Sequence, residues 1–202
     1  MKLHGTTALI VIDVQKAETM PEGAGIPIMP GGEERHERIR AIVAAARAAG
    51  VPPIFIQEVH KRTRVDFGRE LDGTEGVHGL EGDLTTELAD GLDPRADEYH
   101  IRKRRYSAFF ATELDLVLRS YGAETLVLVG ALTDVCVHYT FVDAHQLDYR
   151  CRVVTDCVGG SSSAAHDAAL EAMRYLQRDA WVRSGEVLAA FGAARVPAGA
   201  LA

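Results

Sequence analysis

The chain has 202 residues, a formal net charge of −7, 47% hydrophobic residues and 25% charged residues. This length and composition suit a single soluble globular domain spanning residues 1–202. The negative charge argues against nucleic-acid binding, which needs a basic surface. No apolar run approaches the roughly 20 residues of a membrane span, and the N-terminus lacks a signal-peptide pattern. We therefore expect a cytoplasmic protein that does not bind membranes.

Strand-like and helix-like segments alternate along the chain. Short apolar runs rich in β-branched residues, such as TALIVIDV at 7–14, are typical of strands buried on both faces of a parallel sheet. In chain order, the pattern predicts a strand at 7–14, a helix at 33–49, strands at 53–59 and 99–102, a helix at 111–120, a strand at 125–129, a helix at 135–147, a strand at 152–155, a helix at 163–177, a strand at 180–183 and a helix at 185–191. This alternation predicts an α/β fold with a mainly parallel sheet between two helical layers.

Two connections stand out from this alternation. The stretch 60–97 is rich in glycine and charge and shows only a short helical pattern near 84–88. Long irregular stretches in compact domains usually serve a function. The Pro- and Gly-rich stretch 21–32 is expected to be a loop near the site, and whether it closes over a ligand is left open.

Three polar residues lie near the carboxyl ends of predicted strands: Asp13, Lys103 and Cys136. Sites of parallel α/β sheets gather at this edge. A carboxylate can take a thiol proton and later return it to a leaving amine, and an ammonium or a helix N-terminus favours the thiolate. Each residue also has an ordinary explanation, because such positions often hold a turn-forming Asp, a solvated Lys or a buried Cys. Position alone leaves both interpretations open.

The other two cysteines, Cys151 and Cys157, flank the predicted strand 152–155 and are expected to be buried. An odd number of cysteines without a secretion signal argues against a disulfide framework.

Three segments resemble the isochorismatase-like cysteine hydrolase family: ALIVIDVQ at 8–15, KRRYSAFFATELDLVLRSYG at 103–122 and TLVLVGALTDVCVHYTFVDA at 125–144. This family includes nicotinamidases, N-carbamoylsarcosine amidase, biuret hydrolase and ureidoacrylate amidohydrolase. The resemblance implies a Rossmann-like α-β-α fold with a six-stranded parallel sheet, no cofactor and a homo-oligomer.

The resemblance also implies a catalytic triad of Asp13, Lys103 and Cys136. A cis peptide bond between Ala131 and Leu132 would shape an oxyanion hole, with the backbone N–H groups of Leu132 and Cys136 as donors. The implied reaction is hydrolysis of a small carbamoyl, ureido or amide compound through a thioester on Cys136.

Substrate contacts are less sharply defined. His60 and Tyr106 are the expected substrate-binding residues, and the RYSAFF stretch resembles the biuret, ureidoacrylate and carbamoyl-amide branch. The arginines at 102, 104 and 105 offer either a carboxylate-binding group or solvent-facing charge.

Two alternatives remain. Nicotinamidases in this family hold a metal with an Asp-x-His motif and a later His, and this chain has Glu58, His60 and His78 in similar positions. These residue types suit a divalent metal, although no metal is the first expectation. The other alternative is a non-catalytic binding module of the same fold.

Overall fold

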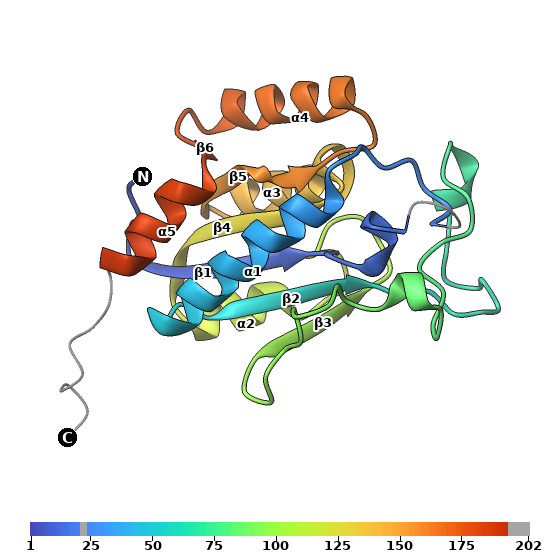
Figure 1. The fold of residues 1–202 in the computed structure, drawn as a ribbon, viewed down its shortest axis with the longest axis horizontal. Coiled ribbons are helices and arrows are strands. Elements are labelled where there is room, and N and C mark those ends of the chain that lie inside the picture. The colour runs from blue at the N-terminus through green and yellow to red at the C-terminus, as the bar shows by residue number, and fades with distance from the viewer. Residues whose placement is uncertain (21–23, 194–202) are drawn as a thin grey trace.

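The computed structural model of the chain describes residues 1–20 and 24–193 (Figure 1). Six strands form one sheet in the order β3-β2-β1-β4-β5-β6, and every neighbouring pair is parallel. The strands are β1 (Thr6–Ile12), β2 (Pro53–Glu58), β3 (Tyr99–Lys103), β4 (Ala123–Ala131), β5 (Arg150–Gly159) and β6 (Trp181–Val182).

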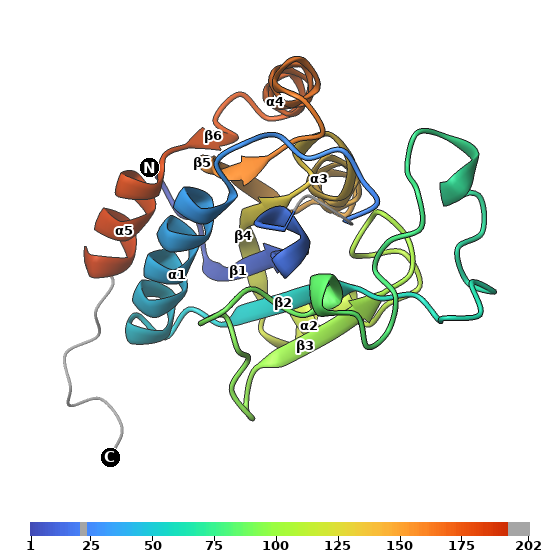
Figure 2. The same cartoon turned by 45° about the vertical axis from the view of Figure 1, so that its right-hand side comes forward.

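Helices cover both faces of this sheet (Figures 1 and 2). The helices are α1 (Gly32–Ala48), α2 (Leu114–Ser120), α3 (His138–Gln146), α4 (Ser163–Leu176) and α5 (Ser184–Ala193). One buried cluster joins α1 and α5 to the sheet, and a second joins α2, α3 and α4 to the opposite face. The predicted three-layer α/β fold is confirmed.

The centre of the sheet is closely packed where β1 and β4 end. Ile12 pairs with Gly130, whose φ is 118°. A Cβ at this glycine would lie 1.8 Å from the carbonyl oxygen of Ile12. Only glycine therefore allows β4 to approach β1 this closely at their carboxyl ends, where both strands leave the sheet.

Some predicted boundaries were wrong. Strand β5 is much longer than the predicted 152–155, so Cys151 and Cys157 lie within it rather than beside it. Both are buried, as expected. Helix α2 begins at Leu114 instead of residue 111, and Ala111 adopts a left-handed φ of 54° that a helix cannot include.

The long connections gather at the carboxyl ends of the strands (Figures 1 and 2). The 60–97 region contains only two 3-10 turns, Glu70–Asp72 and Leu84–Thr86, as its irregular sequence predicts. Part of the expected 21–32 loop, residues 21–23, lies outside the described residues. No helix in the described ranges is long and apolar enough to cross a membrane.

Candidate active site

The carboxyl edge of the sheet brings the three predicted residues together. Asp13 follows β1, Lys103 is the last residue of β3, and Cys136 follows β4. Lys103 Nζ lies 2.8 Å from Asp13 Oδ2 and 3.3 Å from Cys136 Sγ. The ion pair with Asp13 lacks hydrogen-bond alignment, so both oxygens of Asp13 are buried without a hydrogen-bond partner among the described residues.

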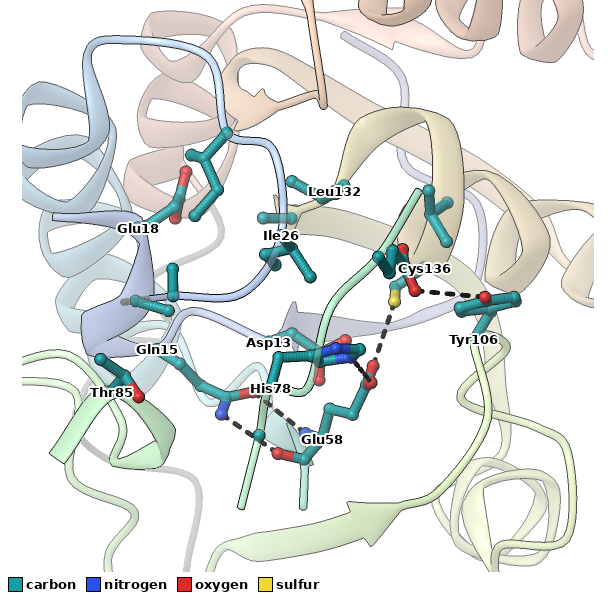
Figure 3. Close-up of a pocket in the computed structure, with 17 residues that line it drawn as sticks. Asp13, Gln15, Glu18, Ile26, Glu58, His78, Thr85, Tyr106, Leu132 and Cys136 are labelled. Carbon is teal, nitrogen blue, oxygen red and sulfur yellow. Dashed lines mark hydrogen bonds and ion pairs between the residues drawn. The ribbon is translucent and has the colours of Figure 1, made fainter. Parts of the chain in front are cut away.

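A fourth residue, Glu58, belongs to the same group. It ends β2 and pairs in register with Lys103 on the neighbouring strand. Its Oε2 lies 2.5 Å from Lys103 Nζ. The same oxygen lies 3.5 Å from Cys136 Sγ, and this contact is drawn in Figure 3. The sequence pointed to Glu58 only as a metal ligand. The alternation Ile54, Ile56, Glu58 would have revealed its place, since these residues face the same side of the strand.

The two carboxylates determine the charge on Lys103. Burial alone would lower the pKa of Lys103, but Asp13, Cys136 and Glu58 together raise it well above its usual value. Burial would likewise raise the pKa of Glu58, but Lys103 and the two neighbouring histidines hold it well below its usual value. Lys103 and Glu58 are therefore a charged pair at neutral pH.

Asp13 and Cys136 behave differently. Burial raises the pKa of Asp13 to about 6, against the opposing effect of Lys103. Burial, reinforced by Asp13 and Glu58, also raises the pKa of the Cys136 thiol in spite of Lys103. The favourable effect of the ammonium on the thiolate is present, but desolvation and the two nearby carboxylates oppose it.

The turn after β4 positions Cys136. The peptide bond between Ala131 and Leu132 is cis, as the resemblance implied. Residues Thr133–Val137 form a π-helical turn that runs directly into α3. The backbone N–H groups of Val135 and Val137 both donate to Leu132 O at 3.1 Å. This turn places the Cys136 side chain at the start of the helical segment and beside the sheet edge.

A pocket opens in front of Cys136 (Figure 3). Its volume is about 600 Å³, including space open to solvent. Its walls combine apolar side chains with a few polar groups. The lining residues are Asp13, Gln15, Ala17, Glu18, Ala24, Ile26, Ile28, Glu58, Glu75, His78, Gly79, Thr85, Tyr106, Ala131, Leu132, Val135 and Cys136. Such a pocket suits a small organic molecule.

The two expected substrate contacts lie in different places. Tyr106 lines the pocket, and its hydroxyl donates to Glu75 Oε2 at 3.2 Å. His60 does not line the pocket; it is fully buried and stacks on Phe67 with ring centroids 3.9 Å apart. Its Nε2 lies 3.3 Å from Glu58 Oε1, so its contact with the site passes through Glu58.

His60 belongs to a cluster of four metal-ligand side chains, Glu58, His60, Glu70 and His78, whose ligand atoms lie within 4.8 Å of one another. Sequence reasoning missed Glu70. His60 Nδ1 and both Glu70 oxygens are buried without hydrogen-bond partners among the described residues. Although burial would lower the pKa of His60, the neighbouring carboxylates of Glu58 and Glu70 raise it to about 9. The cluster fits a divalent cation by residue type and convergence, although Lys103 already holds the second oxygen of Glu58.

The three arginines next to Lys103, at positions 102, 104 and 105, contact groups outside the pocket. Arg104 Nε donates to Asp66 Oδ2 at 2.9 Å, and Arg105 donates to the backbone oxygen of the same residue at 2.6 Å. Arg102 is exposed, 4.0 Å from Glu81. None of the three lines the pocket.

The class of protein follows from this arrangement, in which a parallel α/β sheet carries a thiol, a lysine and carboxylates at its carboxyl edge. A family model described as Isochorismatase domain matches residues 7–187. The chain belongs to the isochorismatase family.

Three members of the family illustrate the proteins to which this chain is similar. The ureidoacrylate amidohydrolase RutB of Caulobacter vibrioides is 34% identical over 171 residues, covering 75% of this chain and 76% of the relative. The probable inactive nicotinamidase At3g16190 of Arabidopsis thaliana is 35% identical over 168 residues, covering 80% and 85%. The crystal structure of N-carbamoylsarcosine amidase from Thermoplasma acidophilum is 27% identical, with a TM-score of 0.75 over 89% of this chain and 97% of that one. The expected class, hydrolases of linear amide C–N bonds, is confirmed by the amidohydrolase and amidase names of these relatives.

Proposed function

We propose that the chain is a cysteine-dependent amidohydrolase that cleaves a C–N bond of a small carbamoyl, ureido or amide compound through a thioester on Cys136. The observation that carries this proposal is the convergence of Cys136 Sγ with Lys103 Nζ and the Asp13 carboxylate at the base of a pocket. Nucleophilic catalysis by a thiol needs a base within reach and a cation that stabilises the resulting anion.

The first half-reaction uses the raised pKa of Asp13. Asp13 takes the proton of Cys136 as Sγ attacks the substrate carbonyl carbon, and Lys103 stabilises the thiolate that forms. A C–S bond replaces the C–N bond, and the leaving ammonia or amine takes the proton from Asp13. In the second half-reaction, Asp13 takes a proton from water, which attacks the thioester, and the regenerated thiol receives that proton.

The turn before α3 supplies the second element of this mechanism. The N–H groups of Leu132 and Cys136 are proposed to donate to the oxyanion of the tetrahedral intermediate. Glu58 also contacts Lys103 Nζ, at 2.5 Å, and its negative charge keeps Lys103 protonated. Glu58 is therefore proposed as a positioning residue.

The test is ammonia release from a panel of biuret, N-carbamoylsarcosine, ureidoacrylate, nicotinamide and simple amides. The wild type is compared with Cys136→Ala and with Cys151→Ala, whose cysteine is also buried but lies in β5 away from the pocket. We expect Cys136→Ala to lower kcat by on the order of 10³-fold or more and Cys151→Ala to remain active.

Release of ammonia by the Cys136→Ala variant at the wild-type rate would refute the nucleophile assignment. A Cys136 that stays inert to iodoacetamide, with no turnover of any amide, would favour the alternative of a non-catalytic module. Mass spectrometry of the wild type quenched during turnover is expected to detect the acyl group on the peptide that contains Cys136.

A second candidate, a metal-assisted deamidase, is supported by the four converging side chains and the unpartnered atoms of His60 and Glu70. In this case Glu58, His60, Glu70 and His78 would hold a divalent cation beside the pocket. A bound cation would supply Lewis-acid polarisation of a carbonyl or of water, while Cys136 and Asp13 keep their roles.

Elemental analysis of the purified protein distinguishes the metal-independent amidohydrolase from the metal-assisted deamidase. Glu70→Gln is the variant to compare, because Glu70 does not line the pocket. One equivalent of metal in the wild type, lost in Glu70→Gln, together with inactivation by a chelator, would support the metal-assisted enzyme. Full activity of a metal-free protein would support the metal-independent one.

A further inference from the structure

The pocket in front of Cys136 has an unusual balance of charge. Its lining includes four carboxylates, from Asp13, Glu18, Glu58 and Glu75. Among the described lining residues there is no lysine or arginine, and the one group able to carry positive charge is His78. A pocket that binds a substrate carboxylate normally presents an arginine or lysine to it.

Three of these carboxylates already have charged partners. Asp13 lies 2.8 Å from Lys103 Nζ, and Glu58 lies 2.5 Å from the same atom. Glu18 is held on both oxygens, at 2.7 Å by an Arg35 guanidinium nitrogen and at 2.7 Å by His36 Nε2. All three therefore have an ion-pair partner within the protein, and Asp13 and Glu58 share Lys103.

Glu75 differs from the other three. Its one hydrogen bond to a described side chain comes from the neutral Tyr106 hydroxyl, at 3.2 Å, and no ion pair to it is found in the described ranges. It is half-buried, and burial raises its pKa. The adjacent residue Gly76 donates its N–H to Gly25 O at 2.6 Å, which fixes the Glu75 loop against the segment that carries Ile26 and Ile28. Glu75 is thus a carboxylate in the pocket wall that has the neutral Tyr106 hydroxyl as its hydrogen-bond donor and no ion-pair partner among the described residues.

The other described lining residues include no lysine or arginine, and Ile26, Ile28, Leu132 and Val135 are apolar. A ligand carboxylate placed away from His78 would lose its hydration without meeting a cation, and beside Glu75 it would meet a second negative charge, which is costly. A ligand ammonium or N–H group would instead give Glu75 the partner that it lacks.

We propose that Glu75 is a specificity-determining residue that makes the pocket select amides bearing an ammonium or neutral N–H donor beyond the scissile bond, and reject amides bearing a carboxylate there. This inference rests on the proposed amidohydrolase function of the same site. Ureidoacrylate and N-carbamoylsarcosine are carboxylates and are therefore expected to be poor substrates.

Three primary amides of similar length test this selectivity: β-alaninamide with an ammonium, butyramide without charge, and succinamate with a carboxylate. At about pH 8, where free glutamate is ionised, kcat/KM is expected to be lowest for succinamate, by about 10- to 100-fold relative to β-alaninamide. Glu75→Gln is expected to reduce the ratio of kcat/KM for β-alaninamide to kcat/KM for succinamate about tenfold, mainly through changes in KM. Glu171→Gln, an exposed change on α4, is the matched control and should leave the ratio unchanged.

A second measurement needs no turnover. Cys136 is labelled with two reagents, the cationic 2-aminoethyl methanethiosulfonate and the anionic 2-sulfonatoethyl methanethiosulfonate. Each labelling rate is divided by the rate of the same reagent with a free thiol. The Cys136→Ala variant gives the background labelling. The wild type should favour the cationic reagent, and Glu75→Gln should weaken that preference about tenfold. Equal normalised rates, or equal ratios in the wild type and Glu75→Gln, would overturn the proposal.

The two measurements also separate failure of the inference from failure of the proposed function. Cys136-dependent turnover that favours succinamate would overturn the selectivity alone. Absence of turnover together with a Glu75-dependent preference for the cationic reagent would count against the amidohydrolase and support the charge selectivity of the pocket.

Discussion

At the scale of single residues, the most important feature is the buried ammonium of Lys103, which lies between two carboxylates and a thiol. Lys103 is 1% exposed and contacts Asp13, Glu58 and Cys136. A charge in this position is tolerated only because the two carboxylates compensate for its lost hydration. Burial raises the pKa of the Cys136 thiol, and the negative charges of Asp13 and Glu58 add to this effect.

The raised pKa of Asp13, about 6, predicts the acidic limb of the pH profile. Asp13 must be ionised to accept the thiol proton, so kcat/KM for an uncharged amide should rise with pH and level off above about pH 6. Below that value it should fall about tenfold for each unit of pH. Initial rates measured from about pH 4.5 to about pH 8 check this limb.

Asp13→Asn serves as the companion variant, because it keeps the size of the side chain and removes the base. Its residual activity should lack the limb near pH 6. A wild-type profile that stays flat between about pH 5 and about pH 8 would contradict the assignment of Asp13 as the base.

The site residues that could be predicted from sequence are those that have a catalytically useful side chain and also lie next to a recognisable strand. Asp13 and Cys136 adjoin long apolar strands, so the strand pattern placed them at one edge of the sheet. Glu70 could not be placed, because it lies in the irregular 60–97 stretch, where no periodicity indicates which way a side chain points. The position of His60 outside the pocket lining could not be foreseen for the same reason. Its contacts with Phe67 and Glu70 depend on how that loop folds back.

At the scale of elements, the contact between two loops determines the shape of the pocket. Residues 24–28 and 75–79 both line it, and they meet where Gly76 N–H donates to Gly25 O. Gly25 has a φ of 80°, and a Cβ on it would lie 2.3 Å from Val77 O. Glycine is therefore required for the two loops to approach this closely.

Gly25→Ala should push these loops apart without disturbing the triad. We expect KM to rise about tenfold with a much smaller change in kcat, and the free energy of unfolding to fall by about 1–2 kcal/mol. Steady-state kinetics and urea denaturation measure the two effects. Gly50→Ala is the matched control, since its φ of 71° imposes similar backbone strain with nothing within 4 Å. An unchanged KM in Gly25→Ala would show that the loop contact does not shape the pocket.

The strand boundaries that sequence missed also have a physical cause at this scale. Strand β5 continues beyond residue 155 through a register irregularity opposite β4. Its second half contains Asp156, and polar residues and glycines break the apolar pattern by which strands are recognised. The family expectation of a homo-oligomer stays a prediction that light scattering on the purified protein can test.

At the scale of the whole molecule, the sheet joins the site to distant parts of the fold. The chain has one tryptophan, Trp181, on the edge strand β6, whose indole N–H donates to Leu170 O at 2.8 Å. The site lies on β1, β2, β3 and the end of β4. Tryptophan fluorescence therefore reports on one edge of the sheet, and labelling of Cys136 reports on the end of the central strand β4.

Urea unfolding followed by these two probes should give coincident transitions, because the two buried clusters extend across the strands between them. Helical circular dichroism supplies a third probe. If fluorescence changes at a lower urea concentration than Cys136 labelling, the β6 edge unfolds separately, and the expected cooperativity is wrong.

The order β3-β2-β1-β4 also has a consequence for the growing polypeptide. The strands that end at or next to Asp13, Glu58 and Lys103 lie side by side with β2 in the middle, and all precede residue 104, whereas β4 pairs with the other side of β1. Synthesis from the N-terminus therefore makes the charged groups before the thiol that they surround. A nascent chain that stops short of β4 therefore contains all three charged residues but not Cys136, so the nucleophile is the last of the four groups to be synthesised.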